Sequence, residues 1–182
     1  MNMYKMAQPI HTLAVKNGWW EGDKDDREVF AMIHAELSEA IEEYRNGKPM
    51  VYHVDGKPEG IAVELIDACI RMLDWLGSKK DAAIRFAFMT APKVNIDAEA
   101  RAMNMFMVSA DTQLPVLVFI LHKRLMVAYD LSDDSLVSIS AIAFIGIIFG
   151  WLRTHGVDPE AIMLEKHEYN KTRPHRHGNK LC

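Results

Sequence analysis

The sequence predicts an all-α protein, because every strong hydrophobic period in its 182 residues is helical. A second observation is the run from Ile61 to Leu76, which is apolar around almost its whole circumference, as in a buried helix. A third is the placement of turn and capping residues: Gly18, the turn Asn46 to Pro49 and the pair Asp158-Pro159 stand where helices end or begin. Together these observations predict a helical bundle with a substantial core.

Length and composition fit one globular domain that spans residues 1–182. Hydrophobic residues make up 49% of the chain, and the formal net charge of -4 gives no footprint for a stable nucleic-acid partner.

Cys69 falls in the predicted buried helix and Cys182 is far from it in sequence, so we expect no disulfide framework and a cytoplasmic location. The start of the chain lacks the apolar segment of a secretory signal. The apolar run Leu136 to Leu152 is shorter than the roughly 20 residues of a membrane span, so we expect a core or subunit-interface helix and no membrane partner.

The individual helices follow from their periodicity and from the residues that flank them. We expect the first between Met3 and Asn17, starting near Pro9, and the second along the stretch Phe30 to Tyr44. A short extended piece at Met50 to Val54 and a turn at Asp55 to Pro58 then precede the buried helix. Further helical patterns cover 81–89, 97–110, 114–129 and 136–152. The last helix begins after Asp158, an N-cap residue followed by proline at the first helical position.

Acidic residues interrupt the buried helix along a single line. Glu64, Asp67, Arg71 and Asp74 recur at steps of three and four, so they project from one side of the helix. Isolated buried carboxylates are costly and take up a proton unless they are paired or bound to a cation. The pattern therefore indicates a partner for these acids.

A second pair, Glu36 and Glu39, lies beside the apolar face of the preceding helix, whose members are Phe30, Ile33, Leu37, Ile41 and Tyr44. Two such helices packed side by side would bring Glu36, Glu39, Glu64 and Asp67 to one point. Ligands that offer only oxygen suit Mg2+ or Mn2+, whereas zinc would normally recruit His or Cys. The alternative is a set of solvated acids with a bridge from Asp67 to Arg71 inside one helix.

Two other groups could serve a ligand beside such a site. Lys166, Tyr169, Asn170 and Arg173 lie in a basic tail, which is either an anion clamp or a solvated extension. The adjacent residues Trp19 and Trp20 are either core anchors or platforms that stack on a flat base.

With both acidic pairs and the tail in view, the chain resembles the MazG-like family of all-α nucleoside triphosphate pyrophosphohydrolases. The matching pieces are His34 to Gly47 with an E-x-x-E pair, Gly60 to Asp67 with an E-x-x-D pair, and Glu165 to Gly178 with Lys-x-x-x-Asn-x-x-Arg. Two features depart from the family's pattern: Ala35 stands where an extra Glu is often found, and the segment from Ser78 to Trp151 is long.

The resemblance implies a bundle completed by dimerisation or a larger homo-oligomer, with an additional helical segment at about 78–152. It also implies hydrolysis of a nucleoside triphosphate, a deoxynucleotide or a non-standard nucleotide, to the monophosphate and pyrophosphate. The implied Mg2+ ligands are Glu36, Glu39, Glu64 and Asp67, and Glu39 would also orient the attacking water. Phosphate or sugar would be bound by Lys166, Asn170 and Arg173, and Tyr169 would contact the sugar or the base. Trp19 and Trp20 would form the base pocket, for which His11 is a weaker candidate.

Two rival functions remain open from the residues. A di-iron protein would typically carry Glu-x-x-His pairs, and neither acidic pair is followed by a suitably spaced His. A non-enzymatic, all-helical metal-binding or protein-interaction module would use the Met-rich and apolar helices as a partner surface.

Overall fold

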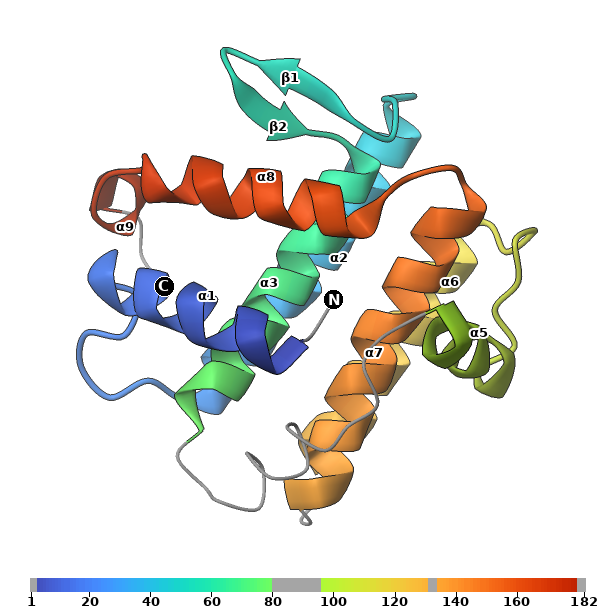
Figure 1. Cartoon of the computed structure of the whole chain (residues 1–182), viewed down its shortest axis with the longest axis horizontal. Coiled ribbons are helices and arrows are strands. Elements are labelled where there is room, and N and C mark those ends of the chain that lie inside the picture. The colour runs from blue at the N-terminus through green and yellow to red at the C-terminus, as the bar shows by residue number, and fades with distance from the viewer. Residues whose placement is uncertain (1–2, 80–95, 131–133, 180–182) are drawn as a thin grey trace.

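The computed structural model describes residues 3–79, 96–130 and 134–179, which form a helical protein with one small hairpin (Figure 1). The helices are α1 (Met3–Lys16), α2 (Asp26–Arg45), α3 (Ile61–Ser78), α5 (Ile96–Met105), α6 (Leu114–Asp130), α7 (Asp134–Thr154), α8 (Pro159–Lys171) and α9 (Arg176–Asn179). The strands β1 (Tyr52–Val54) and β2 (Lys57–Glu59) pair antiparallel between α2 and α3. The all-α class predicted from the sequence is confirmed.

Helix α3 is the central element of the fold. It packs against α1, α2, α7 and α8 (Figure 1), which explains why its sequence is apolar on nearly all sides. Gly77 allows the contact with α1, because a Cβ there would lie 2.8 Å from the backbone oxygen of Ala7 and 2.7 Å from Cβ of His11. A side chain at this position would push α1 away from α3.

Helices α6 and α7 cover the remaining apolar faces of α2 and α3. Helix α6 packs on α2 and α7, and α7 packs on α3. The shared core contains fully buried Ile33 and Leu37 of α2, Leu121 of α6 and Phe149 of α7. Burial of each such side chain contributes about 1.5–3 kcal/mol, so the four helices stabilise one another within a single chain.

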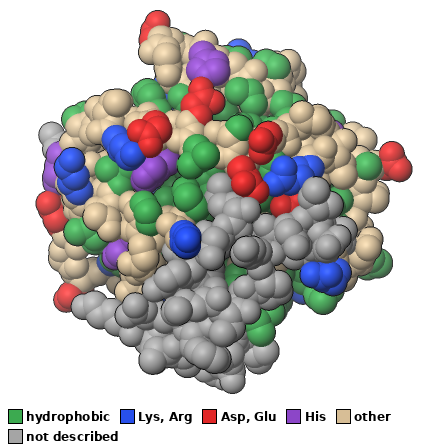
Figure 2. Space-filling model, viewed as in Figure 1, with side chains coloured by type: hydrophobic (Ala, Val, Ile, Leu, Met, Phe, Trp, Pro, Cys, Tyr) green, Lys and Arg blue, Asp and Glu red, His purple; other side chains and the backbone are tan. Residues whose placement is uncertain are grey.

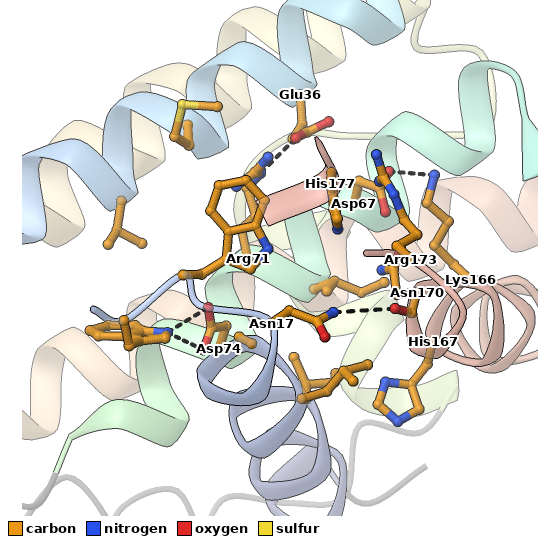
Figure 3. Close-up of a pocket in the computed structure, with 18 of the residues that line it drawn as sticks. Asn17, Glu36, Asp67, Arg71, Asp74, Lys166, His167, Asn170, Arg173 and His177 are labelled. Carbon is orange, nitrogen blue, oxygen red and sulfur yellow. Dashed lines mark hydrogen bonds and ion pairs between the residues drawn. The ribbon is translucent and has the colours of Figure 1, made fainter. Parts of the chain in front are cut away.

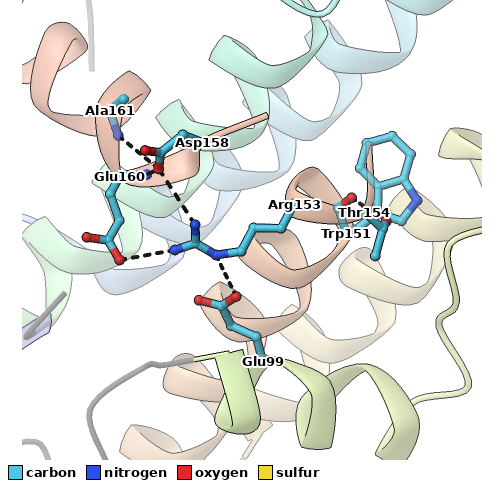
Figure 4. Close-up of polar contacts among 7 residues, drawn as sticks. All are labelled: Glu99, Trp151, Arg153, Thr154, Asp158, Glu160 and Ala161. Atoms are coloured by element: carbon cyan, nitrogen blue, oxygen red, sulfur yellow. Dashed lines mark hydrogen bonds and ion pairs between the residues drawn. The ribbon is translucent and has the colours of Figure 1, made fainter. Parts of the chain in front are cut away.

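Arg153 near the end of α7 connects three helices (Figure 4). Its Nε donates to Oε2 of Glu99 on α5 at 2.8 Å, and Nη2 donates to Oε1 of Glu160 on α8 at 3.1 Å. Asp158, 3.7 Å from the same guanidinium, caps α8 by accepting from the backbone N–H groups of Glu160 and Ala161. The predicted start of the last helix at Asp158-Pro159 is therefore confirmed.

Several element boundaries differ from those predicted. Helix α1 begins at Met3, with Pro9 inside it, because packing of Ala7 and Ile10 against α3 outweighs the one backbone hydrogen bond that proline removes. Helix α5 ends at Met105, five residues earlier than the pattern indicated. On the predicted inward face of α2, Ile41 is partly buried against the core, whereas Tyr44 is 41% exposed.

The β-hairpin was only partly predicted. Tyr52 pairs with Glu59 and Val54 with Lys57, so the turn predicted at 55–58 contains two of the three residues of the second strand. Pro58 in β2 is tolerated because a strand in a two-stranded sheet has a free edge. The predicted helix at 81–89 lies outside the described residues.

The face of the molecule seen in Figure 1 carries side chains of both charges. Figure 2 shows acidic, basic and hydrophobic side chains interspersed over the described elements. Within those elements no single helix is long and apolar enough to cross a membrane; one bent pair, Ile139–Thr154 with Pro159–Lys171, meets the length and composition test together, with 112° between its halves.

Candidate metal and nucleotide site

The packing of α2 against α3 brings three of the predicted acids together. Glu36 of α2 and Glu64 and Asp67 of α3 each place one carboxylate oxygen within 4.8 Å of the others. Glu36 and Glu64 are each only 6% exposed. Glu39 lines the same cavity but is exposed and lies outside this close group. The spacing of the acids on two helices has thus produced one acidic cluster.

Two cations from neighbouring positions contact the cluster (Figure 3). Nε of Arg71 donates to Oε1 of Glu36 at 2.6 Å, and Nζ of Lys166 on α8 lies 2.7 Å from Oδ2 of Asp67. The alternative bridge from Asp67 to Arg71 within α3 is therefore wrong, because Arg71 reaches across to α2 and Asp67 is paired with α8. Lys166 is almost fully buried, with 2% exposure.

Burial shapes the protonation of these groups. Burial first, and the charge of Asp67 second, raise the pKa of Glu64 to about 8, although the charge of Lys166 opposes both. Burial likewise raises the pKa of Asp67, against the influence of Lys166. Burial alone would lower the pKa of Lys166, but the charge of Asp67 and the bond to it raise that pKa above its ordinary value.

The composition of the cluster fits a divalent cation. When Glu36, Glu39, Glu64 and Asp67 are all ionised, their charge exceeds that of Arg71 and Lys166 by two negative charges. All the donor atoms are carboxylate oxygens, as Mg2+ and Mn2+ prefer. A bound divalent ion would remove the energetic penalty of holding these carboxylates ionised in a buried place.

A cavity of about 280 Å3 opens beside the cluster. Its walls come from α1, α2, α3 and α8, from the segment between α1 and α2, and from the hairpin. Besides the cluster it exposes apolar and aromatic side chains to a ligand: Ile10, Leu13, Ala14, Trp19, Trp20, Val29, Met32 and Ile70. A cavity with charged groups and flat apolar walls can hold a molecule that has both a charged part and an apolar part.

Most of the other predicted site residues surround this cavity. Trp19, Trp20, Asn170 and Arg173 line it, as does Lys166. Tyr169 does not line it, since its ring lies against the guanidinium of Arg173, 6.0 Å from Cζ to the ring centroid.

His11 also lies outside the lining but contacts a residue that belongs to it. Nδ1 of His11 is 2.8 Å from Oδ1 of Asp74, and Nε1 of Trp20 donates to the same oxygen at 2.9 Å. The sequence placed Asp74 on the acidic line of α3 without indicating these partners, because they depend on how α1 packs.

Four polar residues of the lining were not predicted as site residues: Asn17, Lys24, His167 and His177. Asn17, which is buried, donates from Nδ2 to the backbone oxygen of Asn170 at 3.2 Å and so joins α1 to α8. No sequence pattern marks such a residue. The sequence did contain a signal for His177, because this residue lies within Glu165 to Gly178, the segment that resembles the family's motif.

The tail beyond α8 packs against the end of α1, so it is not a solvated extension. The backbone N–H of Arg176 donates to the oxygen of Asn17 at 2.8 Å, and its Nε donates to the oxygen of Gly18 at 3.0 Å. His175 bonds to Glu21 at 2.9 Å, and a Cβ on Gly18 would lie 2.1 Å from Nε2 of His175. Gly18, with a φ of +83°, is therefore required for this contact.

Comparisons of the chain with models of protein families, with curated proteins and with solved structures gave no match. The interpretation of the site therefore depends on its own residues and geometry.

Proposed function

We propose that this protein is a MazG-like hydrolase that cleaves a nucleoside triphosphate, with Mg2+, to the monophosphate and pyrophosphate. The observation that carries the proposal is the acidic cluster at a cavity that also exposes cations and two tryptophans. The charges suit a metal-bound polyphosphate, and the indole rings suit a flat base.

In this proposal Glu36, Glu64 and Asp67, with Glu39 at the rim, hold the metal. Bound there, Mg2+ would neutralise phosphate charge and lower the pKa of an attacking water. Glu39 lines the cavity, is exposed and makes no ion pair with another described residue, which supports its proposed role of orienting that water and accepting its proton.

The cationic side chains of the cavity then bind the phosphates. Arg173 presents a planar guanidinium, which can contact two phosphate oxygens at once. Lys166, held by Asp67, contributes a fixed positive charge next to the metal ligands. Asn170 is available to bond phosphate or sugar.

The test is a product assay with common ribo- and deoxyribonucleoside triphosphates, with Mg2+ and with chelator, that separates pyrophosphate from orthophosphate. We expect metal-dependent pyrophosphate and monophosphate, and loss of turnover by about 100-fold or more in Glu64→Gln and Asp67→Asn. Glu42→Gln, an exposed acid on α2 outside the cavity, is the matched control and should keep full activity. Orthophosphate as the first product, or full activity in either cluster variant, would overturn the mechanism.

One observation favours an interaction surface in addition to the site. Helix α6 exposes an apolar line that no described element covers. Val116, Phe119, Met126 and Val127 are 53%, 68%, 52% and 40% exposed. Their steps of three, seven and one place them on one side of the helix. Large exposed apolar patches mark protein interfaces.

We propose that a second copy of the chain covers this line, because its charges are self-complementary. Lys123 and Asp130 lie on the same side of α6 and flank Met126 and Val127. In an antiparallel, two-fold pairing of two α6 helices, Lys123 faces Asp130 of the partner subunit, and the reverse pair forms by symmetry. Met126 then packs against Val127 of the partner subunit.

A further inference from the structure

Asp74 lies on the same helix as two acids of the cluster, at a fixed distance along the helix axis. It follows Asp67 by seven residues on the same side of α3, which corresponds to two turns and about 10 Å along the helix axis. This is similar to the span from the α-phosphate of a nucleotide to the outer edge of its base. A nucleotide whose phosphates meet the cluster therefore extends its base toward Asp74, which also lines the cavity.

The carboxylate of Asp74 is fixed in place. His11 and Trp20 both bond to Oδ1, at 2.8 and 2.9 Å. Trp20 also reaches Oδ2 at 3.1 Å, and Figure 3 draws its two bonds to the carboxylate of Asp74 as dashed lines. The rings of His11 and Trp20 meet edge to face at 5.1 Å. An ionised carboxylate offers about four acceptor positions and cannot donate, so Oδ2 keeps acceptor capacity for a ligand.

One further acceptor atom of a lining residue has no partner within the part of the chain that the structure describes. Oδ1 of Asn170 is buried without a hydrogen-bond partner among the described residues, and Asn17 already uses its Nδ2 on the backbone of Asn170. Among the cations that line the cavity, Arg71 is paired with Glu36 and Lys24 lies 3.5 Å from Glu28. A ligand group that donates a hydrogen bond satisfies the free acceptor capacity of Asp74, whereas one that presents an oxygen atom does not.

We infer that the cavity selects bases with an amino group at position 4 of a pyrimidine or position 6 of a purine, as in cytosine and adenine. Asp74 is the acceptor that recognises this amino group. The inference rests on the proposed function, because the phosphate end of the ligand is assigned by it. Uracil, thymine and hypoxanthine present a carbonyl oxygen at the same position, and a carboxylate repels it.

The experiment compares substrates that differ at that position: dCTP with dUTP, and dATP with dITP. We expect the wild-type protein to prefer the amino-bearing member of each pair by about 10- to 100-fold in kcat/KM, the range of one hydrogen bond to a charged group. Asp74→Asn can present an amide N–H to a carbonyl, so the preference should fall at least about tenfold. Asp23→Asn, an exposed acid outside the cavity, should leave the ratio unchanged.

A second readout separates this inference from the proposed function. Binding of dCMP and dUMP without metal is followed by quenching of tryptophan fluorescence, in the wild-type protein and in Asp74→Asn. If no nucleotide tested releases pyrophosphate, the proposed function is wrong. The ratio of the affinities for dCMP and dUMP would still test the base preference. Equal binding of dCMP and dUMP, or an unchanged preference in a folded Asp74→Asn protein, would overturn the inference.

Discussion

At the scale of single residues, Glu64 couples the site to pH. Its pKa of about 8 lies above the ordinary value of 4.5, so between these values the folded protein binds a proton that the unfolded chain has released. The free energy of unfolding of the metal-free protein should therefore fall as pH rises, by up to about 1.4 kcal/mol per pH unit. Urea unfolding with chelator between pH 6.5 and 8 measures this slope.

That window is chosen because buried and partly buried histidines act in the opposite sense below it. Burial lowers the pKa values of His34, His122 and His167 from 6.5, so these residues raise stability as pH climbs toward 6.5. Glu64→Gln should flatten the slope above 6.5, and Glu42→Gln should keep it. Added Mg2+ should restore stability most at pH 8, where its ligands are ionised. Stability that rises through this window would contradict the raised pKa of Glu64.

The acids of the site were predictable because helical spacing is a local property of sequence. Glu36, Glu64 and Asp67 needed only two helices packed side by side. Their partners were not predictable in the same way: Arg71 bonds to Glu36, 35 positions away, and Trp20 bonds to Asp74, 54 positions away. Such pairs depend on the angle and register at which helices meet, which periodicity does not determine.

At the scale of elements, the Arg153 contacts attach α5 to the rest of the fold. Glu99 is 2% exposed, and its Oε1 has no hydrogen-bond partner among the described residues, so Arg153 neutralises a buried charge. Arg153→Met should lower the free energy of unfolding by about 3–5 kcal/mol, because it leaves that charge unpaired. Denaturant unfolding measures the loss. The double variant Glu99→Leu with Arg153→Met should recover most of it; a double variant as unstable as the single one would show that the charge is not the cause.

Element types were easier to predict than element ends. The cap at Asp158 and the apolar period of α3 are encoded within a few residues and were confirmed. The start of α1 and the hairpin were not, because packing on α3 outweighs the effect of Pro9, and pairing of Tyr52 with Glu59 outweighs the turn signal around Pro58.

At the scale of the whole molecule, the exposed line on α6 predicts a homodimer. Lys123→Asp should weaken it at least about tenfold, because like charges then face each other twice across the two-fold axis. Adding Asp130→Lys to that variant should restore the dimer with the charges reversed. Sedimentation equilibrium measures the dissociation constants, with Lys16→Asp on α1 as a control that leaves association unchanged. A monomeric wild-type protein, or a swap that fails to rescue, would exclude this pairing.

The contact of Arg176 with Asn17 and Gly18 has a consequence for synthesis on the ribosome. The cavity needs α1, which is translated early, and α8 with its tail, which is translated more than 140 positions later. Until Lys166 emerges, Asp67 lacks its cation, and the acidic cluster of the nascent chain is incompletely neutralised. The proposed nucleotide site is therefore among the last parts of the molecule to form, and a messenger truncated after the codon for Leu164 would yield the described helices α1, α2, α3, α5, α6 and α7 without it.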